Sequence, residues 1–269
     1  MSDETPLLVT RQGGVVRAVL NRPARRNALN GALSSALDGL LAELKEDRAA
    51  RVLVLSGAGG HFCAGLDLGE VGGETGTPEQ RVAAQLERNR SIGARFAAIA
   101  ALPQVVIAAV QGSAFAGGLG FVCAADIAFA SGDARFAAPE ARRGLVAAQI
   151  LPWIVRRTGR AQAARMVLQG HVLDAAEAGR IGLVHQLAAD AAALDALVEA
   201  TVADVLQGAP GALAETKGML AALGSAVPDG YAEAGAQSFA RCAASGEADE
   251  GIAAFKARRA PAWLADQSS

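Results

Sequence analysis

The sequence is poor in the residues on which several common kinds of functional site depend. Aromatic residues make up 4% of its 269 residues and the net charge at pH 7 is −2. We therefore expect neither stacking of bases nor a basic surface for nucleic acid. The three cysteines form no CxxC pair, and the three histidines lack the spacing of metal ligands. These features predict no metal site, no disulfide framework and a reducing, cytoplasmic compartment.

Signals for membranes and for two common enzyme classes are absent from the sequence as well. No run of about 18 uninterrupted apolar residues predicts a membrane span, and the polar, acidic start MSDETPLLVT differs from a signal peptide. The chain contains neither the GxxxxGK(S/T) phosphate-binding loop nor the GxSxG turn of serine hydrolases. Two glycine-rich segments remain as the strongest candidates for a functional site.

Short apolar runs typical of strands alternate with helical patterns in the first half of the chain, whereas helical patterns dominate the second half. We expect strands at 7–10, 15–21, 51–57, 105–110, 126–131 and 183–187. We expect helices at 27–47, 78–101, 147–158, 161–169, 174–179, 190–207, 210–223, 228–244 and 249–257. This order predicts an α/β core over residues 1–195 and a helical C-terminal region over residues 196–269.

The two glycine-rich segments are GAGGHFCAGL (57–66) and GSAFAGGLG (112–120), and each follows a predicted strand. Glycine lets backbone N–H groups approach a ligand closely, and the start of a helix favours negative charge. Two such turns facing each other would supply one N–H apiece to a developing oxyanion in a dry site. The residues alone leave a second interpretation open, in which both segments are only tight connections.

Six segments occur in an order that resembles the crotonase superfamily, also called the enoyl-CoA hydratase/isomerase family, over about residues 5–263. These segments are NRPARRNALN (21–30), HFCAGLDLGE (61–70), VVIAAVQGSAFAGG (105–118), ARFAAPEARRGL (134–145), TGRAQAARMVLQGHVLDAAEAGRIGLVHQL (158–187) and EGIAAFKARRAPAW (250–263). The resemblance implies a spiral of ββα units with a helical C-terminal trimerisation region. It also implies an acyl-CoA thioester substrate, no cofactor apart from the coenzyme A of that substrate, and a homotrimer or dimer of trimers.

The resemblance places functions on particular residues. It implies that the backbone N–H groups of Leu66 and Gly117 hold the thioester oxygen and that Glu140 is the acid/base. It implies substrate contacts at Arg25, Ala28, Ala64, Gly65, Asp67, Ala114, Gly118, Gly120, Phe255 and Arg258. The C-terminal pair, Phe255 and Arg258, matches positions that often contact the coenzyme A of a neighbouring subunit. Two of these residues have alternatives, since Arg25 also fits an ordinary surface arginine and Asp67 a residue that orders its own loop.

Gly120 departs from the family pattern, because two-glutamate hydratases of this family carry a glutamate at this position. One carboxylate is enough to take a proton from one carbon and return it to another. The departure therefore favours isomerisation or another enolate reaction. A hydratase or hydratase-lyase acting on a bulky or branched, glutaconyl-type acyl-CoA stays open, as does an acyl-CoA binder without turnover. Gly120 fits either extra room for the acyl chain or helix packing, and Glu70 is a further acid near the first turn.

Overall fold

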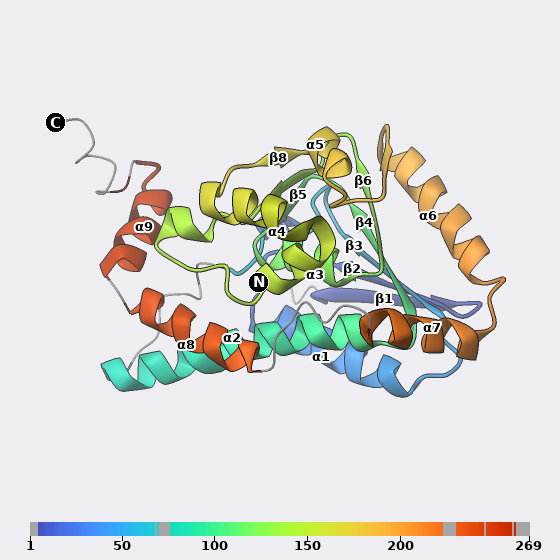
Figure 1. Cartoon of the computed structure of the whole chain (residues 1–269), viewed down its shortest axis with the longest axis horizontal. Coiled ribbons are helices and arrows are strands. Elements are labelled where there is room, and N and C mark those ends of the chain that lie inside the picture. Colours follow the sequence, from blue (N-terminus) through green and yellow to red (C-terminus); the bar gives the residue numbers. More distant parts are fainter. Residues whose placement is uncertain are drawn as a thin grey trace.

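The computed structural model describes residues 5–67, 69, 76–222, 230–244, 246–259 and 261. A six-stranded sheet forms its centre in the order β1-β2-β3-β4-β6-β9, and the β1–β2 pair is antiparallel whereas the other pairs are parallel (Figure 1). Its strands are β1 (Leu7–Gln12), β2 (Val15–Leu20), β3 (Val52–Gly57), β4 (Val105–Val110), β6 (Ile127–Ser131) and β9 (Gln186–Ala188). These strands confirm the six that the apolar runs predict, with β9 shifted toward the C-terminus.

A second, small sheet contains three strands that the sequence did not predict. These strands are β5 (Ser113–Phe115), β7 (Arg135–Ala137) and β8 (Leu173–Asp174), in the order β5-β7-β8. Each has only two or three residues, so its apolar pattern is too short to be distinguished from a loop. The small sheet matters for function because β5 directly precedes the second glycine-rich turn.

Helices surround the sheets, and most of them lie where the sequence predicts. They are α1 (Gly31–Glu46), α2 (Pro78–Ala101), α3 (Gly117–Ala124), α4 (Leu151–Gln169), α5 (Ala175–Arg180), α6 (Ala191–Val205), α7 (Pro210–Ala222), α8 (Tyr231–Ala243) and α9 (Gly246–Lys256). The two helices expected at 147–158 and 161–169 join in α4 around the non-helical residue Gly159. Within the described ranges, no helix has both the length and the apolar character needed to cross a membrane.

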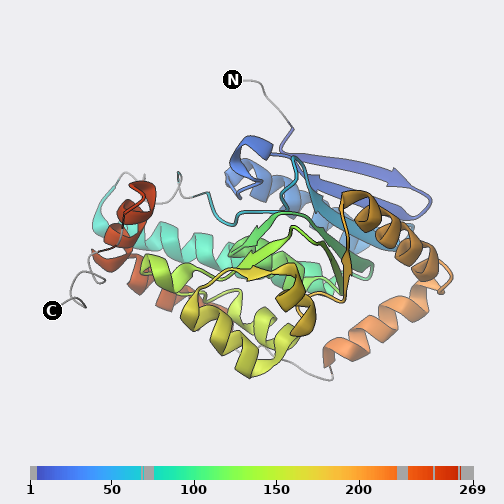
Figure 2. The same cartoon turned by 90° about the horizontal axis from the view of Figure 1, so that it is seen from above.

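The middle strands β3, β4 and β6 of the central sheet are buried on both faces, which explains their near-continuous apolar sequences. In β3, Leu53 and Leu55 belong to the core that includes α1, while Val52 and Val54 belong to a second cluster with α6. Side chains alternate between the faces of a strand, so one strand serves both cores. The helix α8 packs against α2, so that C-terminal residues lie beside the first half of the chain (Figures 1 and 2). The α/β class predicted from the sequence is confirmed.

The short helix α3 is held from its C-terminal end by Arg157 of α4. The Arg157 guanidinium donates to the carbonyl oxygens of Val122 at 3.2 Å, Cys123 at 3.4 Å and Asp126 at 3.4 Å, and also to that of Ala125. The last carbonyls of a helix have no partner inside the helix, and a cation there is favourable for the helix dipole. Arg157 therefore stabilises a helix whose sequence, GGLGFVCA, is poor in helix-forming residues.

We expect Arg157→Met to lower the free energy of unfolding by about 2–3 kcal/mol, because it leaves several buried carbonyl oxygens without a charged donor. The matched control is Arg156→Met, which changes an exposed arginine on the same helix and should cost less than about 0.5 kcal/mol. Denaturant unfolding of both variants measures the difference. Equal stability of the two variants would show that the Arg157 contacts do not hold α3.

Candidate active site

The two glycine-rich turns lie side by side because the backbone of the first pairs with that of β5. The Cys63 N–H donates to the Ser113 carbonyl oxygen at 2.8 Å, and the Phe115 N–H donates to the Cys63 carbonyl oxygen at 2.9 Å. Gly65 lies at φ +88°, and a Cβ there would come within 2.8 Å of the Phe115 carbonyl oxygen. Only glycine combines this backbone conformation with so close an approach. The pairing therefore brings Gly65 against the start of α3.

Backbone strain is concentrated at the residue that precedes α3. Ala116 has φ 48° and ψ −117°, which is a costly conformation for a residue with a Cβ. Its N–H donates to the Ala137 carbonyl oxygen of β7 at 2.9 Å, and its carbonyl oxygen accepts from the Gly120 N–H at 3.0 Å. These bonds hold the turn so that α3 begins at the next residue, Gly117, beside Gly65.

Two backbone N–H groups at this junction have no acceptor among the described residues. Gly117 is the first residue of α3, so its N–H has no partner within the helix. The Leu29 N–H donates to the Gly65 carbonyl oxygen at 2.7 Å, and the Asp67 N–H donates to the Leu29 carbonyl oxygen at 2.9 Å. The N–H of Leu66, which lies between these two bonds along the chain, therefore points away from Leu29. A Cβ placed on Gly65 would lie 3.3 Å from the Gly117 nitrogen, which shows how closely the two turns approach each other.

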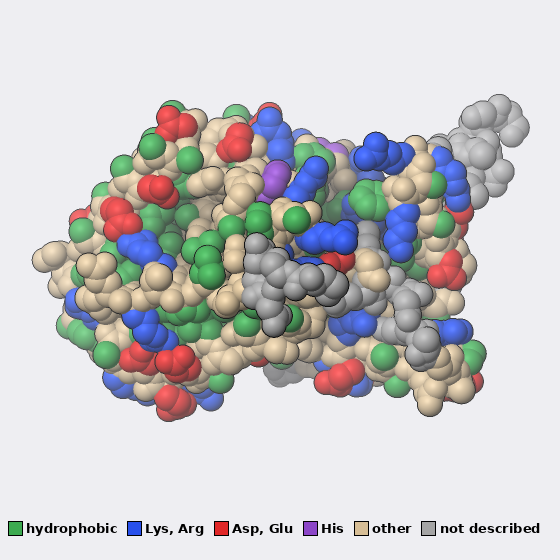
Figure 3. Space-filling view, turned by 180° about the vertical axis from the view of Figure 1, so that it is seen from behind, with side chains coloured by type: hydrophobic (Ala, Val, Ile, Leu, Met, Phe, Trp, Pro, Cys, Tyr) green, Lys and Arg blue, Asp and Glu red, His purple; other side chains and the backbone are tan. Residues whose placement is uncertain are grey.

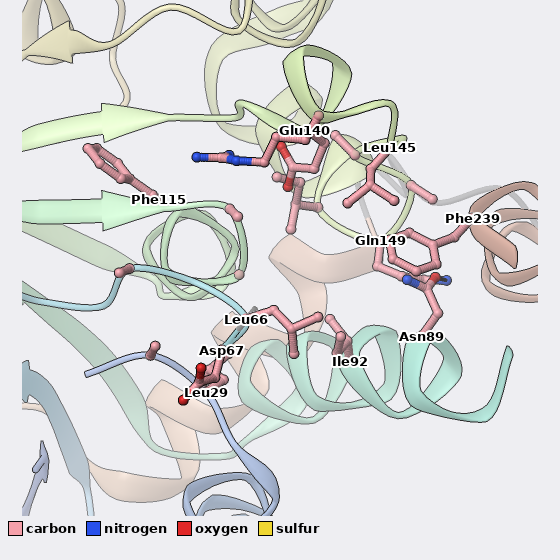
Figure 4. Close-up of a pocket in the computed structure, with 18 of the residues that line it drawn as sticks. Leu29, Leu66, Asp67, Asn89, Ile92, Phe115, Glu140, Leu145, Gln149 and Phe239 are labelled. Atoms are coloured by element: carbon pink, nitrogen blue, oxygen red, sulfur yellow. Dashed lines mark hydrogen bonds between the residues drawn. The ribbon is translucent and has the colours of Figure 1, made fainter. Parts of the chain in front are cut away.

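Leu66, Gly117 and Glu140 all line one cavity of about 410 Å³. Glu140 extends from one wall of this cavity toward Leu66 and Ile92 on the opposite wall (Figure 4). Most of the other lining side chains are apolar, among them Leu29, Leu145, Val146, Ile150, Phe239 and Phe255. Low polarity strengthens hydrogen bonds to a developing negative charge. The arrangement therefore suits a reaction in which negative charge appears on an oxygen near Leu66 and Gly117.

Glu140 is the first residue of the 3-10 turn η2 (Glu140–Arg143). Its Oε2 atom is buried and has no hydrogen-bond partner. Burial raises the pKa of Glu140 to about 7, although its own backbone N–H and the charge of Arg143 act in the opposite direction. A carboxyl group with a pKa near neutrality can both accept and return a proton. Glu140 is thus suited to acid/base chemistry at the cavity wall.

A polar pair interrupts the apolar wall where α2 approaches α8. The Gln149 Nε2 donates to the Asn89 Oδ1 and to the Ala232 carbonyl oxygen, both at 3.0 Å. Glycines make room for this amide, because a Cβ on Gly93 would lie 2.1 Å from the Gln149 Oε1. Gln149 therefore ties the loop after Glu140 to both helices and fixes this side of the cavity (Figure 4).

Comparisons with known proteins agree with this geometry. The family model described as enoyl-CoA hydratase/isomerase matches residues 10–266. The chain is 34% identical to a putative enoyl-CoA hydratase of Thermus thermophilus (95% and 99% of the two chains). It is 33% identical to the 2,3-dehydroadipyl-CoA hydratase of Escherichia coli (95% and 97%). A crystal structure of an enoyl-CoA hydratase from Mycobacterium avium superposes with a TM-score of 0.86 at 37% identity (97% and 99%).

The chain belongs to the enoyl-CoA hydratase/isomerase family. Its fold is the α/β crotonase fold, with mixed sheets and C-terminal helices. The resemblance seen in the sequence motifs is thereby confirmed for family and fold.

The site residues implied by the family resemblance fall into two groups. Those that line the cavity with Leu66, Gly117 and Glu140 are Arg25, Ala28, Ala64, Asp67 and Phe255. Those that are not on its wall are Gly65, Ala114, Gly118, Gly120 and Arg258. Three residues of the second group shape the junction of the two turns, and the role of Gly65 there is described above. Ala114 forms a backbone β-bridge with Cys63. Gly118 lies so close to the first turn that a Cβ on it would come within 2.2 Å of the Cys63 carbonyl oxygen.

Asp67 also orders its own loop, as the alternative interpretation of the sequence states. Its carboxylate pairs with Arg22 at 3.0 Å and accepts a hydrogen bond from the Gly69 N–H at 3.0 Å. Glu70, the further acid considered from the sequence, lies outside the described residues.

The sequence motifs did not predict Asn89, Arg143 and Phe239 as cavity residues. Of these, only Arg143 carried a signal, because it lies in the PEARRG motif three residues after Glu140.

Gly120 is buried by helix packing in this member of the family. A Cβ on Gly120 would lie 2.4 Å from the Phe96 Cζ and 2.9 Å from the Ile150 Cγ2. Phe96 is itself fully buried and packs edge-on against Phe121, with ring centroids 5.4 Å apart. The space beside Gly120 is therefore filled by a protein side chain rather than left open to the cavity. This favours helix packing over extra room for an acyl chain.

We expect Glu140→Gln to stabilise the protein increasingly as the pH rises. The pKa of Glu140 is about 7 in the folded protein against an ordinary value of 4.5 for a glutamate, so the folded state loses stability as pH rises between these values. Glutamine stays neutral, so the gain in melting temperature should be small at pH 4.5 and largest near pH 8. Thermal unfolding of both proteins at the two pH values measures it. A gain that does not change with pH would contradict the raised pKa.

We expect Gly120→Ala to cost about 1–3 kcal/mol of stability, because the added methyl overlaps the Phe96 ring in a filled core. Phe96→Leu removes the ring atoms that the methyl would meet, so the double variant should lose less than the sum of the two single variants. Gly39→Ala on α1, where nothing lies within 4 Å of an added Cβ, is the control for helix propensity. Additive losses in urea unfolding would argue against direct packing of Phe96 on Gly120.

Proposed function

We propose that this chain is an acyl-CoA-processing enzyme that stabilises a thioester enolate and moves a proton with a single glutamate. The observation that supports this most is the meeting of three groups at one cavity, namely the N–H groups of Leu66 and Gly117 and the carboxyl of Glu140. The N–H groups are fixed by the backbone before substrate binds, so they need no reorganisation when charge develops. Among the described residues that line the cavity, the acids are Glu140 and Asp67, and Asp67 is paired with Arg22.

The favoured reaction is an isomerase-type proton shift. Ionised Glu140 removes a proton from a carbon of the acyl chain, and the electron pair moves through the conjugated system to the thioester oxygen. The N–H groups of Leu66 and Gly117 bind that oxygen while it is negative. Neutral Glu140 then returns the proton to a different carbon, the double bond has moved, and the carboxylate is regenerated. One group performs both transfers, which is consistent with glycine at position 120.

Hydration is the second candidate, because the relatives named above are described as hydratases. In this reaction Glu140 would activate a water that adds to the double bond, or would act in a hydratase-lyase sequence on a bulky or branched, glutaconyl-type acyl-CoA. Position 120 is a glycine packed against Phe96, so the water would be held by Glu140 together with backbone groups or with another acid. An acyl-CoA binder without turnover is the third and weakest candidate.

The proposal places the phosphates of coenzyme A at the exposed mouth of the cavity. Arg25 and Arg26 are exposed and line the cavity. Figure 3 shows several Lys and Arg side chains on the face of the molecule opposite to the view of Figure 1. Phe255 is 53% exposed although it lines the cavity from α9. This exposure favours the homotrimer, or dimer of trimers, in which a neighbouring subunit covers the C-terminal helices. The cytoplasmic location stays a prediction from the sequence.

We expect Glu140→Gln to lower kcat/KM by about 10²- to 10⁴-fold, the usual contribution of a positioned acid/base. The Kd of a saturated, unreactive acyl-CoA should stay unchanged, and wild-type kcat/KM should rise with pH through one ionisation near pH 7. Steady-state kinetics on a panel of 2-enoyl- and 3-enoyl-CoA substrates, with calorimetry for binding, measure these quantities. Unchanged turnover of every accepted substrate by the variant would remove Glu140 from the mechanism.

The same assays run in ¹⁸O-labelled water identify which reaction Glu140 catalyses. A proton shift gives a product without the label, whereas hydration gives a hydroxyacyl product that contains it. Tight binding of acyl-CoA without conversion of any substrate would instead support the non-catalytic alternative.

A further inference from the structure

Arg143 occupies the same turn as Glu140 and lines the same cavity. Its guanidinium carbon lies 4.4 Å from the centroid of the Phe255 ring on α9. The ring covers one face of the guanidinium, so the cation is partly removed from water, and Arg143 lines both this cavity and a second, smaller pocket. Nothing in the proposed proton transfer uses this residue.

Arg143 lacks the partners that other partly buried arginines have. Over the described part of the chain, the structure contains no ion pair and no hydrogen bond for its guanidinium, and its Nε is buried without an acceptor. In contrast, Arg95 forms two hydrogen bonds of 2.7 Å with Asp38, and Arg22 pairs with Asp67. A desolvated charge without a partner is costly in a folded protein. An anionic ligand bound in the cavity would therefore supply the partner that the Arg143 guanidinium lacks.

The neighbouring carboxyl of Glu140 does not meet this need. Its oxygens lie beyond ion-pair distance from Arg143, since no bridge of 4 Å or less joins the two. Burial lowers the pKa of Arg143, whereas the charge of Glu140 acts in the opposite direction. Glu140 also gains and loses a proton in each proposed catalytic cycle, so it cannot serve as a permanent counterion.

The position of Arg143 is fixed by close backbone packing. Gly251 of α9 lies so near that a Cβ there would come within 2.6 Å of the Arg143 carbonyl carbon. Gly144, at φ +68°, ends the turn, and a Cβ on it would lie 2.5 Å from the Glu247 carbonyl carbon. The turn is thus packed tightly against α9, and this packing fixes the backbone position of Arg143 at the cavity wall.

Resting on the function proposed above, we infer that Arg143 binds a carboxylate on the acyl chain, so that the preferred substrates are CoA thioesters of dicarboxylic acids. Arginine offers paired donors that match the two oxygens of a carboxylate. The acyl chain is the part of the substrate that must reach Glu140, and Arg143 lies three residues from it in the same turn. The phosphates of coenzyme A have Arg25 and Arg26 available at the exposed side of the cavity.

The decisive experiment measures binding of unreactive thioesters, so that it does not depend on turnover. Calorimetry compares glutaryl-CoA with pentanoyl-CoA, and adipyl-CoA with hexanoyl-CoA, which differ within each pair by a carboxylate in place of a methyl group. We expect the wild-type protein to bind at least one dicarboxylic thioester about 10- to 100-fold more tightly than its neutral counterpart, as for hydrogen bonds between charged groups. Arg143→Met should abolish this preference and leave the Kd of the neutral thioesters unchanged.

Two further variants keep the test specific. Arg143→Lys retains the charge without the paired donors and should keep part of the preference. Arg142→Met is the matched control, because the neighbouring Arg142 is exposed, donates to the Gln169 carbonyl oxygen and does not line this cavity. It should leave the preference intact. Retained binding of hexanoyl-CoA shows that each variant is folded, and if Arg143→Met fails to fold, Arg143→Lys and the wild-type preference decide.

Three outcomes would overturn the inference. Equal wild-type affinity for both members of each pair would show that no acyl carboxylate is recognised. A preference that survives Arg143→Met would assign the carboxylate to another residue. Weaker binding of all CoA thioesters by Arg143→Met, with pantetheine thioesters unaffected, would show that Arg143 binds a phosphate instead. Different results would contradict the proposed function itself, namely that no CoA thioester binds or that Glu140→Gln leaves turnover unchanged.

Discussion

The backbone pairing of Cys63 with Ser113 and Phe115 is the interaction on which the rest of the site depends. It joins a loop that leaves β3 to the short strand that follows β4, so two segments far apart in the chain meet at one point. The pairing requires glycine at Gly65 and Gly118, where any side chain would strike the opposite backbone. Once the pair forms, the N–H groups of Leu66 and Gly117 are placed by main-chain geometry.

Support for this junction comes from two directions. From the far end of α3, Arg157 satisfies the carbonyl groups that would otherwise end in an apolar core. From the start of α3, Ala116 holds a strained conformation that its hydrogen bonds to β7 and within the helix enforce. A helix of this composition would not form alone in water. Its stability derives from tertiary contacts, and those contacts also fix the direction of the helix dipole toward the cavity.

The sequence predicted the main strands and helices well, because their signals are local. Runs such as VLVL in β3 and the leucine face of α1 fix both the element type and the buried side. The strands β5, β7 and β8 and the helix α3 were not foreseen, since their lengths and composition carry no periodic signal and only long-range contacts define them. The motifs also led to Leu66, Gly117 and Glu140, which the structure brings to one cavity. The partners of Gly120 and the unpaired state of Arg143 depend on residues distant in sequence, which no local pattern encodes.

The C-terminal helices give the site a property that its motifs cannot supply. Phe239 of α8 and Phe255 of α9 line the same cavity as the glycine turns, and α9 packs directly on the turn that bears Glu140. The burial that raises the pKa of Glu140 is therefore produced in part by residues far from it in the sequence. Burial is what raises the pKa of Glu140, so a change in the packing of α8 and α9 against this wall would move that pKa back toward the ordinary range of a glutamate. The pKa of this carboxyl is thus coupled to the packing of two helices that lie outside both glycine-rich turns.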